Sequence, residues 1–294
     1  MNCDILVIAG PTGVGKTKLS IELAKRLNAE IINGDAMQVY KKMNIGTAKV
    51  REEEKENIPH YLFDIVEPSV NYTVFDYQKD GRAKIKEILG HDKKVIIVGG
   101  TGLYIKALLY DYDFKEGTTT NNYENLNNEE LLEEIKKYNK DINVHVNNRK
   151  RLVRYLNKYE NNESIESNKD NLLYNAKFIG LTTERENLYS IIDNRVDKMI
   201  SDGLIEEAEE LIKNYQDSKA LQTAIGYKEF IPYFNNEESK EIVIENIKKN
   251  SRHYAKRQYT FFKNQFNMKW FNVDYKNFNN TINEVLDYLK ESSK

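Results

Sequence analysis

The sequence has few of the residues on which disulfide-bonded, zinc-binding and membrane proteins depend. Its 294 residues include 1 cysteine, Cys3, which excludes an intramolecular disulfide and a zinc site built from thiolates. The 4 histidines are scattered without metal-ligand spacing. The start of the chain lacks the basic and apolar regions of a signal peptide, and no apolar run approaches the ~20 residues of a membrane span. We therefore expect a cytoplasmic protein without a membrane-bound part.

An excess of charge of either sign is also missing. The 44 lysines and arginines nearly cancel the 46 aspartates and glutamates, which leaves a net charge of −2. This balance excludes a histone-like polycation, but it does not exclude nucleic-acid binding, because charge can be segregated locally. With 40% hydrophobic residues the chain can bury a sizeable core, so wholesale disorder is excluded.

Short apolar runs alternate with amphipathic stretches in the first hundred residues. The runs predict strands at 5–9, 30–32 and 94–98, with a weaker candidate at 61–66, and the amphipathic stretches predict helices at 16–27, 74–89 and 102–109. This alternation is typical of βα units around a parallel sheet. We predict an α/β fold in which helices flank that sheet.

The composition changes near residue 111. Two asparagine-rich stretches, 120–128 and 157–171, are predicted to be loops, and the segment 129–158 between them is mostly helical. A strand at 176–181 returns to the core, followed by helices at 184–201, 204–215, 219–230 and 242–262 and a short strand at 268–273. We predict a catalytic core of residues 1–110 and 176–294, carrying a helical insertion at 111–175.

A phosphate-binding loop directly follows the first predicted strand. The stretch Gly10-Pro11-Thr12-Gly13-Val14-Gly15-Lys16-Thr17 matches G-x-x-x-x-G-K-[ST], which chance places in about one chain of this length in a hundred. Glycines let backbone N–H groups turn toward phosphate oxygens, and the helix N-terminus adds its dipole. Lys16 is placed to reach the outer phosphate and the Thr17 hydroxyl to ligate Mg²⁺.

The sequence gives weaker support to a kinase or NTPase. Such enzymes usually hold Mg²⁺ with an aspartate at the end of an apolar strand, whereas the strand at 94–98 ends in Gly99-Gly100-Thr101. Asp35 and Asp64 do follow strand-like segments, so this alternative stays open. Asp64 fits both Mg²⁺ binding and bracing of the core.

Three side chains have a structural as well as a functional interpretation. Asp35 and Thr101 each stand where a helix N-cap would follow a strand. Arg195 lies on or beside an otherwise apolar helical stripe, where it needs an anion partner, a local carboxylate or a path to solvent.

Basic residues gather in two places, at 149–154 and along the helix at 242–262. The second set alternates with aromatic residues, as expected for contact with RNA phosphates and unstacked bases. The alternative is a solvated helix face whose aromatic residues belong to the core.

Seven segments together resemble the bacterial tRNA dimethylallyltransferase family. They are the phosphate-binding loop, 35–40 with 43–49, 59–64, 99–104, 195–197, 226–229 and 255–260, in the family's order and over nearly the whole chain. The resemblance implies a Mg²⁺-dependent prenyltransferase with a P-loop core. It would transfer a dimethylallyl group from dimethylallyl diphosphate to N6 of the adenosine 3′ to the tRNA anticodon.

The resemblance also implies roles for individual residues. Asp35 would be the base that accepts the amine proton, Thr101 would lie beside the adenosine, and Lys16 with Arg195 would hold the diphosphate. The residues implied to contact tRNA are Asp35, Ala36, Met37, Gln38, Thr101, Lys150, Arg151, Arg154, Thr223, Gly226, Tyr227, Lys228, Lys256, Arg257 and Gln258. The partner would be the anticodon stem-loop, and we expect the protein to be a monomer.

Some positions depart from the family pattern. Gly34 and Ala36 replace the usual serines, Ile142 and Asn148 replace expected insertion residues, and Phe261 replaces a tryptophan. These departures bear on the anticodon-arm contacts rather than on catalysis. Three alternatives stay open: an adenylate isopentenyltransferase acting on free nucleotides, a P-loop nucleotide kinase or NTPase, and a non-catalytic RNA-binding module.

Overall fold

The computed structural model of the chain describes residues 3–112, 121–142, 144–163 and 171–291. They form two compact units: a core unit, Met1–Tyr110 with Leu172–Lys294, and an insertion unit, Asp111–Asn171. The predicted insertion ended at residue 175, but residues 172–175 lie with the core. Leu172 bridges Tyr110, and the carbonyl of Asn175 accepts the Asp4 N–H at 2.9 Å. Residues 120 and 164–170 of the predicted loops lie outside the described residues.

The core unit is built on a six-stranded sheet in the order β3-β2-β4-β1-β5-β6. Every pair of neighbouring strands is parallel. The strands are β1 (Ile5–Ala9), β2 (Ala29–Asn33), β3 (His60–Tyr61), β4 (Lys94–Val98), β5 (Ala176–Thr182) and β6 (Lys269–Asn272). The predicted α/β fold with a parallel sheet is confirmed.

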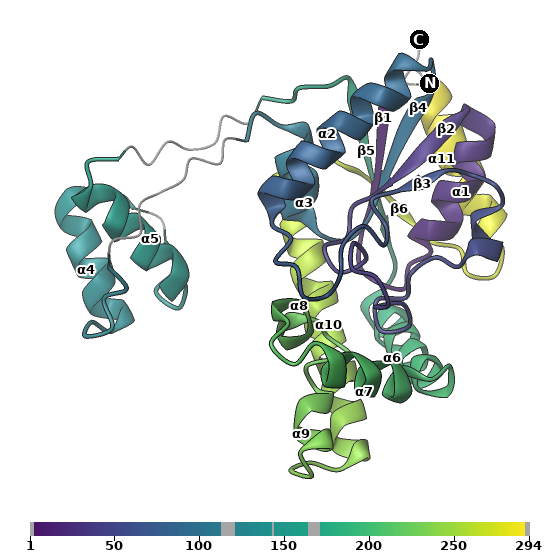
Figure 1. Cartoon of the computed structure of the whole chain (residues 1–294). Helices are drawn as coiled ribbons and strands as arrows, with labels where there is room; N and C mark the ends of the chain where they lie inside the picture. The colour runs from purple at the N-terminus through teal and green to yellow at the C-terminus, as the bar shows by residue number, and fades with distance from the viewer. Residues whose placement is uncertain (1–2, 113–120, 143, 164–170, 292–294) are drawn as a thin grey trace. The chain divides into compact units, whose positions relative to one another are not determined.

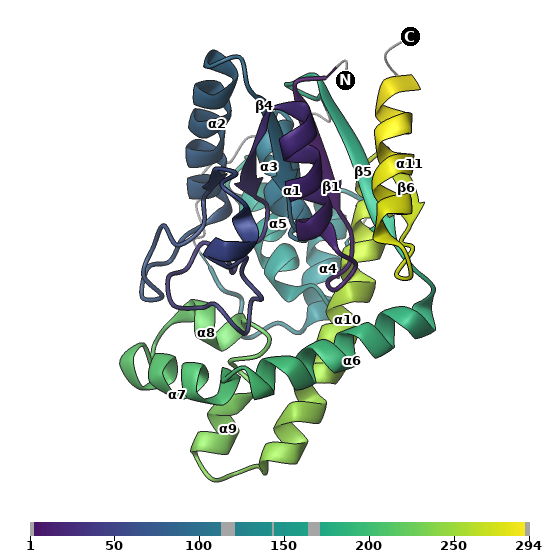
Figure 2. The same cartoon turned by 90° about the vertical axis from the view of Figure 1, so that its right-hand side faces the viewer.

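Helices cover both faces of this sheet, which explains why its central strands β1 and β4 are apolar at every position except Lys94. Alternate residues of a strand point to opposite faces. Leu6 and Ile8 therefore pack against α1 (Lys16–Leu27) and α11 (Phe278–Glu291). Ile5 and Val7 pack against α2 (Val74–Gly90) and α3 (Gly102–Leu109) on the other side. Figures 1 and 2 show these two helical layers on either side of the strands.

A second group of helices lies beyond the carboxyl ends of the strands (Figures 1 and 2). It comprises α6 (Arg185–Ser201), α7 (Leu204–Asn214), α8 (Lys219–Thr223), α9 (Phe230–Phe234) and the first half of α10 (Lys240–Gln265). Their apolar residues form a core of their own around Val196, Leu204 and Tyr227, joined by Met43 from the loop after β2. Ligands of parallel α/β proteins bind at this end of the sheet.

The insertion unit contains α4 (Asn128–Tyr138) and α5 (Arg149–Glu160). Leu131 and Ile135 of α4 pack with Leu152 and Leu156 of α5 in a small apolar core. Asn127 caps α4, because its side chain accepts the N–H of Glu130. The segment 129–158 was predicted to be mostly helical, and the described residues between the two helices, 139–142 and 144–148, are not helical.

One sequence prediction of secondary structure is wrong, and two elements of the structure were not predicted. The helix predicted at 219–230 is instead the two short helices α8 and α9, because Gly226 between them has φ 92°, which a helix does not accommodate. The helix α11 and the 3-10 helix η1 (Glu52–Lys55) were not predicted. Ile282, Val285 and Leu289, which α11 buries at helical spacing, are the signal that identifies it.

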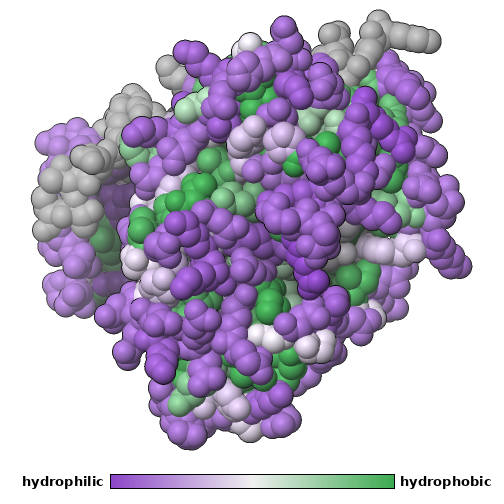
Figure 3. Space-filling model, turned by 45° about the vertical axis from the view of Figure 1, so that its right-hand side comes forward, coloured by the Kyte–Doolittle hydropathy of each residue, from purple (hydrophilic) through white to green (hydrophobic). Residues whose placement is uncertain are grey.

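The surface is mostly polar. The face drawn in Figure 3 is predominantly hydrophilic, with hydrophobic residues in small separate groups. None of the helices in the described part of the chain combines the length and hydropathy of a membrane-spanning segment.

Candidate active site

The phosphate-binding loop lies between β1 and α1, as its motif predicts. Gly10, Gly13 and Gly15 have φ values of 140°, 88° and 89°, which side chains rarely allow. A Cβ at Gly10 would also lie 2.4 Å from the carbonyl oxygen of Leu181 in β5. The loop therefore requires glycine at these positions, and it leads directly into the N-terminus of α1.

Lys16 folds back over this loop. Its Nζ donates to the carbonyl oxygens of Gly10 at 3.0 Å and Pro11 at 2.8 Å. Burial lowers the pKa of Lys16 to about 7, with Arg195 adding to the effect and Asp35 opposing it. The next residue, Thr17, is exposed, and its hydroxyl has no hydrogen bond within the described residues. An anion entering the loop would meet both groups.

Asp35 lies just beyond β2 and is held by hydrogen bonds to residues 33 and 37. Its N–H donates to Asn33 Oδ1 at 2.8 Å, and its Oδ1 accepts the Met37 N–H at 3.0 Å. The residues that follow form turns and not a helix, so the N-cap interpretation is wrong. Burial raises the pKa of Asp35, although the Met37 N–H, Lys16 and Arg195 act in the opposite direction. A desolvated carboxylate of this kind accepts a proton more readily than an exposed one.

Thr101 joins two strand ends. It stands at the N-cap position of α3, but its side chain makes no bond to that helix. Its Oγ1 instead accepts the Ala36 N–H at 3.0 Å, and its N–H donates to the Gly34 carbonyl at 3.0 Å. A Cβ at Gly99 would lie 2.1 Å from Gly34, so the two turns touch through glycine backbone. The N-cap interpretation of the Thr101 side chain is therefore wrong.

Helix α10 runs from the second group of helices to the phosphate-binding loop and closes this side of the site. The side-chain amide of Gln258 donates to the Gly100 carbonyl and accepts the Thr12 N–H, both at 3.1 Å. Gln258 is 4% exposed, and both ends of its amide bond the protein, but it also lines the cavity described below, so its contact with tRNA stays a prediction. Tyr254, one turn earlier, lines the same cavity as Thr101 and Gln258, and burial raises its pKa to about 12. Sequence reasoning did not select Tyr254 as a site residue, although its i, i+4 spacing to Gln258 indicates a shared face.

Arg195 of α6 faces the same space. Within the described part of the chain it has no ion pair, because the nearby Asp193 and Asp197 bind Arg252 and Lys248 of α10 at 2.5 and 2.7 Å. The predicted alternative of a local carboxylate partner is therefore wrong. Burial lowers the pKa of Arg195, and Asp35 opposes this shift. The guanidinium is a half-buried cation available to an anionic ligand.

One cavity of about 910 Å³ connects these groups. Most of the predicted residues line it: Thr12, Gly13, Gly15, Lys16, Thr17, Asp35, Ala36, Met37, Gln38, Thr101, Arg195, Thr223, Gly226, Lys228, Arg257 and Gln258. Gly10, Pro11, Val14, Tyr227 and Lys256 do not line it. The cavity thus brings the phosphate-binding loop, the cations Lys16 and Arg195 and the half-buried carboxylate of Asp35 together at the carboxyl edge of the sheet.

Tyr227 contradicts its predicted contact with tRNA. Its side chain is 0% exposed, and its hydroxyl donates to Glu207 Oε1 at 2.7 Å. A Cβ at Gly46 would lie 2.6 Å from its ring. The residue is a core side chain beneath the cavity wall, and the helical group hides it from any large ligand.

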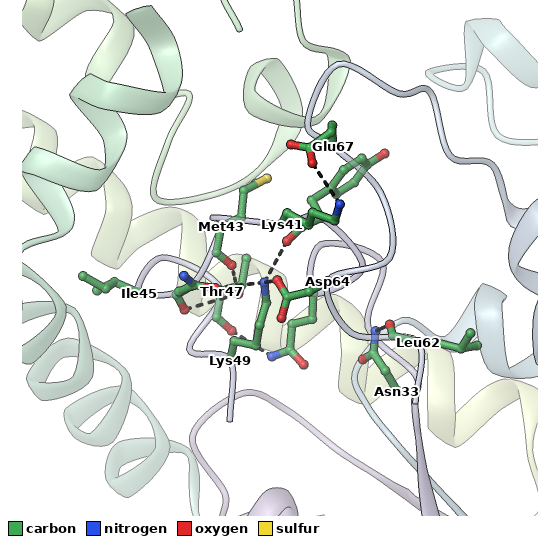
Figure 4. Close-up of polar contacts among 12 residues, drawn as sticks. Asn33, Lys41, Met43, Ile45, Thr47, Lys49, Leu62, Asp64 and Glu67 are labelled. Atoms are coloured by element: carbon green, nitrogen blue, oxygen red, sulfur yellow. Dashed lines mark hydrogen bonds and ion pairs between the residues drawn. The ribbon is translucent and has the colours of Figure 1, made fainter. Parts of the chain in front are cut away.

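The loop after β2 is held by Lys49, whose ammonium group donates to Asp64 Oδ1 at 2.6 Å and to the Tyr40 carbonyl at 2.7 Å. In Figure 4 the side chains of Lys49 and Asp64 point toward each other. Burial lowers the pKa of Lys49, which Asp64 opposes. Asp64 does not line the cavity, so this structure assigns it to bracing the loop.

Only some of the basic residues of α10 lack an ion-pair partner among the described residues. Lys248 and Arg252 pair with Asp197 and Asp193 of α6, so their charges are already compensated within the core unit. Phe261 and Phe262 belong to the core on the sheet, as their alternative interpretation stated. Lys256 and Arg257 are exposed and have no ion pair among the described residues.

The insertion unit presents its own cations on α5. Lys150, Arg151 and Arg154 are exposed, and none has an ion pair within the described residues of that unit. The guanidinium groups of Arg151 and Arg154 lie 5.1 and 5.7 Å from the centroid of the Tyr155 ring. Arg149 differs, because it donates to the carbonyls of the loop before α4.

The described residues offer few ligands for a divalent metal ion. The described residues contain no group of three or more histidines, cysteines, aspartates and glutamates able to hold a metal ion. The Thr17 hydroxyl is available at the loop. Mg²⁺ commonly takes few protein ligands and several from substrate phosphates and water. The residues therefore fit a Mg²⁺ ion that arrives with a diphosphate, and do not fit a metal held by protein alone.

Comparison with known proteins identifies relatives over nearly the whole chain. The family model for IPP transferase matches residues 38–265. A tRNA dimethylallyltransferase of Anoxybacillus flavithermus is 46% identical over 303 residues, covering 99% of this chain and 97% of the relative. One of Enterococcus faecalis is 47% identical over 284 residues, covering 92% and 91%.

Solved structures of the same family resemble the fold of this chain. A tRNA isopentenylpyrophosphate transferase from Bacillus halodurans aligns with a TM-score of 0.76 at 38% identity, covering 99% of this chain and 98% of that one. A eukaryotic dimethylallyltransferase acting on tRNA aligns with a TM-score of 0.77 at 30% identity, covering 90% and 73%. These matches in sequence and structure, over most of the chain, show that it belongs to the IPP transferase family, as its motifs predicted.

Proposed function

We propose that the protein transfers a dimethylallyl group from dimethylallyl diphosphate to N6 of the adenosine immediately 3′ to the anticodon of tRNA. The products are N6-dimethylallyladenosine and diphosphate. One observation carries this proposal: a single cavity is lined at once by a phosphate-binding loop with Lys16 and by the half-buried carboxylate of Asp35. The named activity of the relatives supports it.

The phosphate-binding loop would hold the donor. As the allylic C–O bond breaks, its electron pair leaves with the diphosphate. The backbone N–H groups of 10–17, Lys16 and Arg195 supply positive charge where this negative charge develops. Mg²⁺, when bound through the diphosphate and Thr17, would neutralise further charge on the leaving group.

Asp35 and Thr101 would serve the acceptor. The exocyclic amine of adenosine is a poor nucleophile, so its proton must leave as the new C–N bond forms. Burial raises the pKa of Asp35, which suits a carboxylate that accepts this proton. Thr101, whose Oγ1 accepts the Ala36 N–H, would orient the base. An adenosine extruded from the anticodon loop would enter the cavity.

Exposed cations would bind the tRNA backbone. Lys256 and Arg257 of the core unit are one set, and Lys150, Arg151 and Arg154 of the insertion unit are the other. Each set has no ion pair among the described residues, so each is available to phosphates.

The test is to incubate the purified protein with Mg²⁺ and labelled dimethylallyl diphosphate, and to offer either unmodified tRNA or AMP as acceptor. We expect label in tRNA, on the adenosine 3′ to the anticodon. Label in AMP alone would identify a free-nucleotide enzyme. Absence of label in both, together with ATP turnover in the absence of prenyl donor, would identify a P-loop NTPase.

A further inference from the structure

The carboxylate of Glu207, on α7, accepts hydrogen bonds from three consecutive backbone N–H groups. Oε2 accepts from Asn44 at 3.1 Å, both oxygens accept from Ile45 at 2.9 Å, and Oε1 accepts from Gly46 at 3.1 Å. Successive N–H groups that converge on one point form a concavity of partial positive charge that binds an anion. Here the protein supplies that anion itself, and charge-assisted bonds of this kind are about twice as strong as neutral ones.

The same carboxylate holds a second segment. The buried hydroxyl of Tyr227 donates to Glu207 Oε1, and the Tyr227 ring packs against Gly46, where no Cβ would fit. Residues 46–48, at the end of the segment that Glu207 holds, line the cavity. Residues 223–226, which directly precede Tyr227, line it as well. Glu207 therefore joins two walls of the cavity from outside, without lining it.

The segment 43–49, which we call the acceptor loop, also sets the position of Gln38. The amide of Gln38 donates to the carbonyls of Thr47 at 2.9 Å and Ala48 at 3.4 Å. Gln38 lines the cavity three residues after Asp35. A displacement of the acceptor loop thus moves the amide that lies beside the proposed base.

The acceptor loop does not have a conformation that its sequence alone favours. Ala48 has φ 46°, and Lys42, just before the loop, has φ 63°. Residues other than glycine keep such left-handed values only where their surroundings hold them. The contacts with Glu207, Tyr227 and Lys49 supply that support.

We propose that Glu207 is a positioning residue for the acceptor side of the cavity, acting through the acceptor loop on Gln38 and on the wall that the adenosine contacts. This inference rests on the proposed function and adds to it a residue that sets tRNA affinity from outside the site. Among the described residues no hydrogen bond or ion pair joins Glu207 to the phosphate-binding loop, so we expect donor binding to be independent of it.

The experiment measures steady-state kinetics of the full chain with Glu207→Ala, Glu207→Gln and the control Glu209→Ala. Glu209 is an exposed carboxylate on the same helix, without a hydrogen bond or ion pair in the described part of the chain. We expect Glu207→Ala to raise KM for tRNA about tenfold, the size expected for losing bonds to a charged group. KM for dimethylallyl diphosphate should stay within about twofold. Glu207→Gln keeps one acceptor oxygen, so its KM for tRNA should lie between those of Glu207→Ala and the unmodified protein. The KM values of Glu209→Ala should match those of the unmodified protein.

Hydrogen exchange gives a second readout that does not depend on activity. Amides of 44–46 should exchange faster in Glu207→Ala than in Glu209→Ala, while those of 10–17 should be unchanged. If Glu207→Ala does not fold, Glu207→Gln carries both measurements.

The outcomes separate the inference from the proposed function. An active unmodified protein whose Glu207 variants keep their tRNA KM and their exchange rates overturns the inference. An equal rise in both KM values with a lower Tm assigns Glu207 to general stability, and also overturns it. An unmodified protein that labels no tRNA overturns the proposed function instead, and hydrogen exchange then decides alone whether Glu207 holds the loop.

Discussion

Lys16 and Asp35 face one cavity, and burial shifts the pKa of both toward the uncharged form. The pKa of Lys16 falls to about 7, and that of Asp35 rises. Each charge also favours the charged form of the other. A diphosphate bound at the loop would favour the charged form of Lys16, so ligand binding and protonation are linked at this residue.

The first prediction concerns the proposed base. Asp35→Asn keeps the size of the side chain and an oxygen for the Met37 N–H, but it cannot take a proton. We expect prenyl transfer to fall by roughly 10²–10⁴, while tRNA binding stays close to that of the unmodified protein. Single-turnover transfer and a filter-binding assay measure the two effects. Turnover within tenfold of normal would remove Asp35 from this role.

The second prediction follows from the pKa of Lys16. The protonated form binds an anion, and its fraction falls as the pH rises through about 7, so diphosphate affinity should decrease from pH 6 to pH 8. Near pH 7.5 the binding of inorganic diphosphate should take up protons. Calorimetry in buffers of different ionisation enthalpy measures this uptake. Lys16→Arg, which stays charged, should lose it; equal uptake in both proteins would assign the proton to the diphosphate itself.

At the scale of elements, α10 connects the separate parts of the core unit. Ile247 packs in the helical group, Gln258 bonds the phosphate-binding loop, and Phe262 packs on the sheet. The helical group is therefore placed over the strand ends by one continuous helix. The acceptor loop forms the opposite wall of the cavity. Its position depends on the close packing of Gly46 against Tyr227.

The third prediction tests that packing. Gly46→Ala places a methyl group 2.6 Å from the buried Tyr227 ring. Such overpacking should lower the free energy of unfolding by about 1–3 kcal/mol, measured by urea denaturation. Gly90→Ala is the control, because no atom lies within 4 Å of a Cβ there. Equal stability of the two variants would show that the ring moves aside without cost.

At the scale of the whole molecule, a net charge of −2 conceals local segregation. Many surface lysines and arginines pair with carboxylates, as Lys248 and Arg252 do. The cations left without such partners among the described residues include Lys150, Arg151 and Arg154 of α5. An overall charge near zero therefore does not prevent either unit from presenting cations to a polyanion.

The fourth prediction concerns these cations. Arg151→Ala should weaken tRNA binding and reduce the slope of log K against log salt by about 1, the effect of losing one phosphate contact. Binding measured at several salt concentrations gives the slope. Lys137→Ala, which removes a cation already paired with Glu134 in the same unit, should leave the slope unchanged. An unchanged slope for Arg151→Ala would show that this residue contacts no phosphate.

The sequence by itself determined the features that depend on neighbouring residues. The phosphate-binding loop, the buried strands and the helices α1 and α3 follow from local periodicity and glycine placement. The structure has β1, β4, α1 and α3 at the predicted bounds, and β2 and β5 within one residue of them at each end. The family was evident from short motifs in order. Most of the site residues predicted from those motifs in the core unit also line the cavity.

Only the tertiary structure decided which side chains are free to act. Gln258 meets Thr12 across 246 residues of sequence, and the Tyr227 hydroxyl meets Glu207 of α7. The second bond holds in the core a side chain that was expected to contact tRNA. Lys248 and Arg252 are likewise taken up by α6. Local patterns report the residue types on a helix face but not the element that packs against it. Partners, burial and shifted pKa values therefore appear only when distant segments come together.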